Sequence, residues 1–145
     1  MITSLRIFVT IALLTVAGTL YAGDAVVVDN AWIRYLPGDG PMAGYFTLHN
    51  ESDEIVTLVG ASSPRFAKVH LHRTTQRDGM SSMEPLDVVL VPPHGEIAFE
   101  PGGYHLMLMQ RQGDVSVGDE VTIELHFGDG SARQVRFTVR PAWQE

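Results

Sequence analysis

Two segments near the C-terminal end of the chain alternate strictly between apolar and polar residues. Residues 121–127 read Val-Thr-Ile-Glu-Leu-His-Phe, and residues 134–140 read Gln-Val-Arg-Phe-Thr-Val-Arg. In an extended strand, a period of two places one set of side chains on each face, so each segment predicts a strand with one buried face. Gly128-Asp129-Gly130-Ser131 lies between them and is typical of a hairpin turn.

Short runs of β-forming residues, separated by turn residues, cover most of the remaining chain, and no long stretch has helical periodicity. Seven to nine strands at this spacing predict an all-β fold, a two-sheet sandwich or a barrel. We find no repeat and no long linker, so residues 23–145 are predicted to form one domain. Besides the two segments above, the runs of β-forming residues are 26–28, 32–35, 45–48, 54–59, 67–74, 88–91, 97–99 and 104–110.

The first 22 residues differ from the rest and predict a secretory signal peptide, 1–22. Arg6 is followed by an uncharged apolar run, 7–20, and then by small and turn-forming residues, with the expected cut after Ala22. A retained membrane anchor is the alternative, although the run is shorter than the roughly 20 residues that a spanning helix needs. We therefore expect an exported protein without stable membrane insertion after cleavage.

Net charge and cysteine content further limit the partners and metal ligands that are compatible with the chain. Cleavage removes Arg6 and no acidic residue, so the remainder has nine basic and 17 acidic residues and a net charge of −8. Such a surface repels nucleic acid and anionic lipid, and favours cations and basic partners. The chain has no cysteine. A metal site in an oxidising compartment therefore has to use other ligands.

Imidazole and thioether donors gather in three segments of the chain. Residues 69–73 carry two histidines, and residues 104–109 carry one histidine and two methionines. Residues 78–83 carry Met80 and Met83, in what we expect to be a loop that reaches over the other two segments. Thioether sulphur is soft and suits Cu(I), whereas zinc normally recruits histidine, cysteine or carboxylate. The donor set therefore indicates a Cu(I) site.

Strand geometry predicts which of these donors share a face. Because residues i and i+2 point the same way, His70 lies beside His72, and His105 beside Met107 and Met109. We expect the intervening valine and leucines to fill the core and the donors to face outward. A carboxylate (Glu84, Asp87 or Glu100) is expected to orient a ligand histidine. We expect the other mature-chain histidines, His49, His94 and His126, at the surface.

Four donors occur at a distinctive spacing, His72-x10-Met83-x21-His105-x-Met107. In this pattern the chain resembles the periplasmic copper chaperones called PCuAC, whose motif is H-x10-M-x21-H-x-M. Further similar stretches extend the resemblance over nearly all of residues 24–140. They are residues 30–34, 44–50, 60–64 and 101–109.

The resemblance implies a cupredoxin-like Greek-key β-sandwich that binds one Cu(I) near its surface through His72, Met83, His105 and Met107. It also implies that the chain is a carrier and not an enzyme, which delivers copper for cytochrome c oxidase assembly beside a Sco-type protein and an oxidase subunit. His70, Met80 and Met109 are left as neighbours, with His70 open as an auxiliary ligand.

Other functions fit the sequence less well. A blue-copper electron carrier requires a cysteine thiolate, which the chain lacks. A hydrolase has no G-x-S-x-G motif to support it. The alternative that stays open is a metal-free exported β-sandwich that binds another protein.

Overall fold

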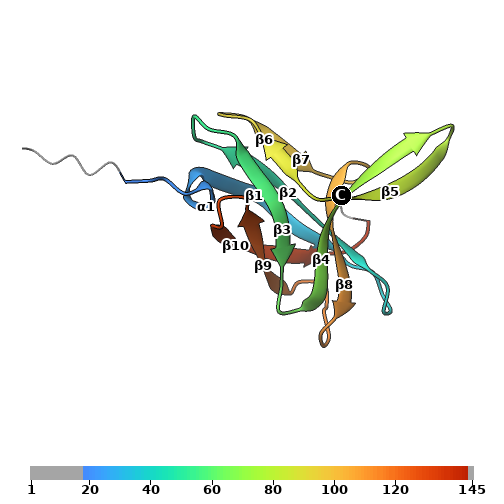
Figure 1. Ribbon diagram of the computed structural model, residues 1–145. Coiled ribbons are helices and arrows are strands. Elements are labelled where there is room, and N and C mark those ends of the chain that lie inside the picture. Colours follow the sequence, from blue (N-terminus) through green and yellow to red (C-terminus); the bar gives the residue numbers. More distant parts are fainter. Residues whose placement is uncertain (1–17, 144–145) are drawn as a thin grey trace, which may run out of the picture.

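The computed structural model describes residues 18–143, and the first 17 residues of the expected signal peptide lie outside this range. One short helix and ten strands make up the described part (Figure 1). They are α1 (Ala22–Ala25), β1 (Val26–Arg34), β2 (Met42–Asn50), β3 (Val56–Ser62), β4 (Phe66–Arg77), β5 (Met80–Leu86), β6 (Val89–Val91), β7 (Glu96–Phe99), β8 (Tyr104–Arg111), β9 (Glu120–Phe127) and β10 (Ala132–Arg140). No helix among these residues is long and apolar enough to cross a membrane.

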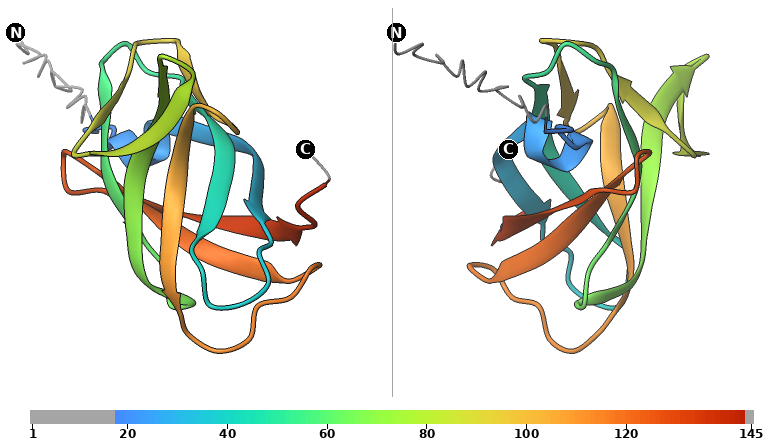
Figure 2. Two further views of the ribbon diagram at one scale, coloured as in Figure 1. Left: turned by 90° about the vertical axis from the view of Figure 1, so that its right-hand side faces the viewer. Right: turned by 60° about the vertical axis from the view of Figure 1, so that its left-hand side comes forward.

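All ten strands belong to one sheet, in the order β5-β4-β8-β7-β2-β1-β10-β9-β3-β6, with a further pairing of β8 and β2. The sheet curls into two facing layers, so that β3 comes to lie beside β4 (Figure 2). Apolar side chains from both layers fill the space between them. The predicted all-β sandwich or barrel is therefore confirmed.

The alternating segments form the hairpin of β9 and β10. Every second residue of β9, from Val121 to Phe127, is buried, as are Phe137 and Val139 of β10. Gly130 has a φ of 84°, which a residue with a side chain rarely adopts, and its N–H bonds to the Phe127 carbonyl at 3.0 Å. The predicted period and turn are both confirmed.

Two expectations about the elements are wrong. The runs 26–28 and 32–35 form a single strand, β1, whose register with β2 shifts at a bulge between Asp29 and Trp32. Residues 80–83 are the start of strand β5 and not a loop. Asp78 and Gly79 have φ values of 52° and 74°, which suit a tight hairpin turn, so β4 continues directly into β5.

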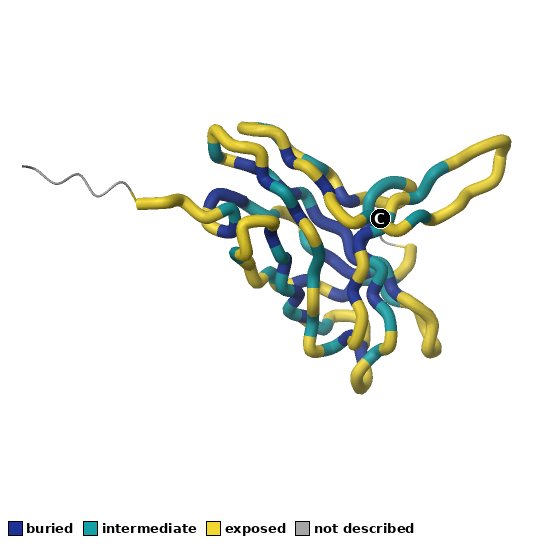
Figure 3. The backbone as a smooth tube through the Cα atoms, in the orientation of Figure 1, coloured by how far each residue is buried: buried dark blue, intermediate teal, exposed yellow. Residues whose placement is uncertain are grey.

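The hairpin of β4 and β5 projects from the body of the molecule (Figure 1). β5 is an edge strand of the sheet, and none of its residues is buried (Figure 3). By contrast, β4 and β8 pair over most of their length and send Val69, Leu71, Leu106 and Leu108 into the core. The residues that alternate with these four therefore face outward, as predicted.

Candidate metal centre

The register of β4 and β8 brings the predicted donors of these two strands together. His72 lies directly opposite His105, and His70 directly opposite Met107. Residues that face each other in an antiparallel pair have Cβ atoms about 4.5–5.5 Å apart, and diagonal neighbours about 7–8 Å apart. The His72 and His105 rings have centroids 5.7 Å apart. Both imidazoles and the Met107 thioether therefore belong to one cluster on the outward face.

His105 is the deepest member of this cluster, with 4% of its surface exposed. Its Nδ1 lies 3.2 Å from the Gly103 carbonyl oxygen, and since a carbonyl oxygen only accepts, Nδ1 is the nitrogen that carries the proton. In this tautomer Nε2 holds a free lone pair. That Nε2 is buried and has no hydrogen-bond partner. A buried acceptor without a partner costs free energy, which a bound cation would recover.

His72 has the same character. Its Nδ1 is buried and has no hydrogen-bond partner. Burial lowers the pKa of the His72 imidazole from its ordinary value of 6.5, and the nearby His105 and His70 rings lower it further. The ring is therefore neutral at pH 7, which is the form that coordinates a metal.

The methionines approach this pair of histidines from two strands. Met107 is half-buried and lies one diagonal step from His72 across the β4–β8 pair. Met83 lies opposite Thr74 on β5, and Thr74 shares its face of β4 with His72, so Met83 is also a diagonal neighbour of His72. Met83 is 59% exposed, which leaves its sulphur free to move toward the histidines.

Two further methionines lie outside the cluster. Met80 is three residues from Met83 along β5, so it points to the opposite face, and it is 75% exposed beside the hairpin turn. Met109 shares the face of Met107 but lies opposite Lys68, one step farther from the histidines. His70 is exposed on the donor face, with its ring centroid 6.3 Å from that of His72.

A carboxylate does not orient the histidine in the way we expected. The Gly103 carbonyl performs this role for His105, and it also accepts a hydrogen bond from the Thr74 N–H at 3.0 Å. Glu84 is held by Arg73 instead, at 2.6 Å. Gly103 follows the turn at Pro101-Gly102, where Gly102 has a φ of 83°, and the sequence pattern did not single out its carbonyl as a partner of His105.

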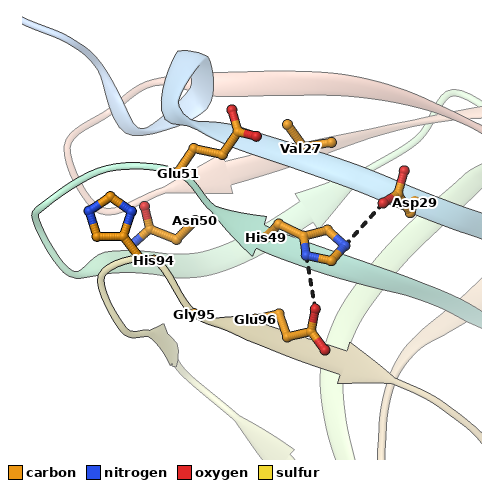
Figure 4. A pocket seen from close by; sticks show the side chains of 8 residues that line it. All are labelled: Val27, Asp29, His49, Asn50, Glu51, His94, Gly95 and Glu96. Atoms are coloured by element: carbon orange, nitrogen blue, oxygen red, sulfur yellow. Dashed lines mark ion pairs between the residues drawn. The ribbon is translucent and has the colours of Figure 1, made fainter.

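The other histidines have partners of their own. A cavity on the same sheet face is lined by His49, whose ring lies between Asp29 (Nε2–Oδ2 3.0 Å) and Glu96 (Nδ1–Oε2 2.9 Å), as Figure 4 shows. Both nitrogens of this ring are therefore engaged. His94 contacts Asp53 at 2.6 Å, and His126 contacts Ser62 at 2.8 Å.

Residues 18–143 contain no group of three or more histidine, aspartate or glutamate side chains that is placed to hold a metal ion. Within this part of the chain, the two histidines of the cluster are accompanied instead by the neighbouring methionine sulphurs. Thioether and imidazole together select a soft ion. Fold and site thus define a class of protein, a curled β-sheet domain with an outward-facing candidate centre for a soft metal.

Comparison with known proteins places the chain within that class. The chain belongs to the LpqE-like family, described as "Putative lipoprotein LpqE-like", whose profile matches residues 26–139. A protein of Leifsonia xyli subsp. xyli, named "Putative lipoprotein Lxx21020", is 30% identical over 81% of this chain and 70% of its own length. An uncharacterised protein of Rickettsia prowazekii is 32% identical over 67% of this chain, which spans only 54% of that protein.

Solved structures give the same result for the fold. The Cu(I) form of DR1885 from Deinococcus radiodurans is 33% identical, with a TM-score of 0.64 over 79% of this chain and 76% of that one. Its apo form is 30% identical, with a TM-score of 0.62 over 97% and 94%. The copper-bound PCuAC domain of PmoF2 is 23% identical, with a TM-score of 0.69 over 83% and 97%, and supports the fold alone. The chain thus has the fold of PCuAC domains, as its sequence resemblance implies.

Proposed function

We propose that the chain is a Cu(I) carrier that holds one ion between His72, Met83, His105 and Met107. The observation that carries the proposal is the pair of buried, unpartnered imidazole nitrogens, His72 Nδ1 and His105 Nε2, on the face that also bears the two thioethers. The Cu(I)-bound relative with the same fold supports the choice of ion. We regard the chain as a binding protein and not an enzyme.

The ligand set suits delivery better than permanent storage. Imidazole and thioether are neutral, so the bound ion keeps its positive charge and a thiolate acceptor can outcompete them. Three of the donors are at least partly exposed, which lets the ligands of an acceptor enter as these leave. Copper then passes between proteins by ligand exchange, without release of free ions.

We further propose where the copper goes. The PCuAC resemblance suggests delivery toward cytochrome c oxidase, beside a Sco-type thiol protein and with an oxidase subunit as acceptor, in the periplasm. The lipoprotein name of the family fits an exported location. A transfer assay from the Cu(I)-loaded domain to purified oxidase copper domains tests this assignment, and failure with each acceptor would refute it.

The copper site itself has a direct test. Residues 23–145 are purified and titrated with Cu(I) against the chelator bicinchoninate, next to the joint variant His72→Gln, Met83→Leu, His105→Gln and Met107→Leu. We expect one tightly bound ion in the wild type and none in the joint variant. As a matched control, His94→Gln and Met80→Leu together remove one histidine and one methionine outside the cluster and should leave the titration unchanged.

A normally folded wild type that takes up no Cu(I) would favour the alternative, a metal-free module that binds another protein. Circular dichroism of each variant separates loss of the site from loss of the fold.

A further inference from the structure

His70 is a third imidazole at the edge of the donor cluster, and the proposed ligand set leaves it unused. It lies on β4 directly opposite Met107 and two residues from His72. Its ring is close to parallel with that of His72, at an interplanar angle of 23°. Because Val69 and Leu71 on either side of it are buried, its side chain points outward with the other donors.

The three imidazoles form a gradient of exposure. His105 is buried, His72 is half-buried and His70 is exposed. The sequence of strand pairs orders them in space as well, since His105 faces His72 across the sheet and His70 follows His72 along β4. An ion that moves from His105 toward His70 therefore moves from the interior of the site to its solvent side.

The edge of β4 is uncovered beside His70, whereas β5 covers it beside His72. β5 covers the edge of β4 only as far as the pair Leu71–Leu86, so His70 is the first residue of the donor face beyond the hairpin. A cavity lies at this position, between β4, the end of β5 and β3. Its lining includes His70, Gly60, Pro85 and Asp87. An incoming ligand can reach His70 there without displacing the strand that carries Met83.

His70 is nevertheless not placed to bind together with both other histidines. No three histidine or carboxylate side chains of residues 18–143 are arranged around a common metal position. The imidazole of His70 can therefore coordinate the ion only after another donor has dissociated from it. Met107 is its direct cross-strand neighbour and is the donor that can stay bound during such an exchange.

We infer that His70 is the exit ligand of the site, a residue that takes up Cu(I) transiently as Met83 or His105 releases it and presents the ion to an acceptor at the adjoining cavity. This inference rests on the proposed Cu(I) function. The ion keeps its +1 charge throughout, because one neutral donor replaces another and no electron is transferred. His70 acts on the rate of transfer and not on the equilibrium affinity.

The test compares His70→Gln with wild type and with the control His94→Gln, which changes an exposed histidine outside the cluster. Two quantities are measured on Cu(I)-loaded protein: affinity, by competition with bicinchoninate, and the rate of transfer to the chelator bathocuproine disulfonate by stopped flow. We expect His70→Gln to slow transfer about tenfold, a barrier change of about 1.4 kcal/mol, with affinity held within about threefold. His94→Gln should change neither quantity.

Two results would overturn the inference alone. One is a transfer rate in His70→Gln equal to that of wild type. The other is an affinity lowered about tenfold or more, together with the loss of one imidazole from the copper X-ray absorption spectrum, which would make His70 a resident ligand. Failure of the wild type to take up Cu(I) is a different outcome, because it overturns the proposed function itself.

Discussion

Alternate residues of strand β8 face the core and the proposed copper site, and two neighbouring substitutions can test this assignment of its two faces. Leu106 is fully buried, and its Cβ lies 3.4 Å from where a Cβ on Gly44 would be, so its side chain packs against β2. Met107 is half-buried on the outward face. We therefore expect Leu106→Ala to damage the fold and Met107→Leu to damage the site.

The magnitudes follow from burial. Truncating a fully buried leucine to alanine costs about 3 kcal/mol through lost transfer free energy and the cavity left behind. In a domain of this size that corresponds to a fall in Tm of about 12 °C. Met107→Leu keeps the side-chain volume, so it should cost less than about 1.5 kcal/mol. It removes the thioether, however, and should lower Cu(I) affinity about tenfold or more, a loss of at least about 1.4 kcal/mol of binding free energy.

Differential scanning calorimetry of the apo proteins and chelator competition at a temperature where both variants are folded provide the two measurements. Leu106→Ala should bind one Cu(I) with wild-type affinity once folded, and Met107→Leu should melt near the wild type. If Met107→Leu lowers Tm as much as Leu106→Ala does, or leaves copper affinity unchanged, the assignment of the two faces of β8 is refuted.

Three further predictions concern the other ligands and the core. The pKa of His72 is lowered in the folded protein, so below pH 6.5 the unfolded chain takes up a proton that the folded chain does not. The stability of the apo protein should therefore be constant above pH 6.5 and fall as the pH decreases below it. Denaturation at pH 5 to 8, and an NMR titration of His72 with a midpoint under 6.5, check this prediction. Met83→Leu should weaken Cu(I) binding about tenfold in chelator competition, whereas Met80→Leu, on the opposite face of β5, should bind as the wild type does. Equal losses of affinity in the two variants would contradict the register of β4 and β5. Asn50 is 2% exposed and donates hydrogen bonds to the carbonyls of Glu54, Val91 and Pro92. Asn50→Ala should therefore lower the free energy of unfolding in urea by about 3 kcal/mol and leave copper uptake intact. A decrease under about 0.5 kcal/mol would show that water replaces these bonds.

Local sequence rules predicted the strands and the faces of the donors well. The alternation over 121–127 was sufficient for β9, and the i, i+2 rule correctly paired His70 with His72 and placed Met107 beside His105. These features depend only on the geometry of one strand. The spacing of His72, Met83, His105 and Met107 then selected four donors through a resemblance, which strand geometry alone did not do.

Features that depend on partners distant in the sequence were not predicted. The β1 bulge follows from register against β2, and the bond from the Thr74 N–H to the Gly103 carbonyl joins β4 to the turn before β8. Met80 was left as a neighbour of the site because it falls outside the motif spacing, and residues 80–83 were expected to form a loop. The Asp78-Gly79 turn, which is a hairpin signal in its own right, places the two methionines on opposite faces.

Met83 differs from the other three proposed ligands in how firmly its strand is held by the rest of the sheet. His72, His105 and Met107 belong to paired strands whose reverse sides are packed in the core, whereas β5 contributes no buried residue and pairs only with β4. Bending its outer part, residues 80–84, away from the body breaks pairing with β4 alone, because Leu86, which packs against the core, lies at the other end of the strand. In the proposed site, Met83 can therefore leave a bound ion without displacing the three ligands that are fixed against the core. We expect substitutions near Asp78-Gly79 to alter the rate of copper release.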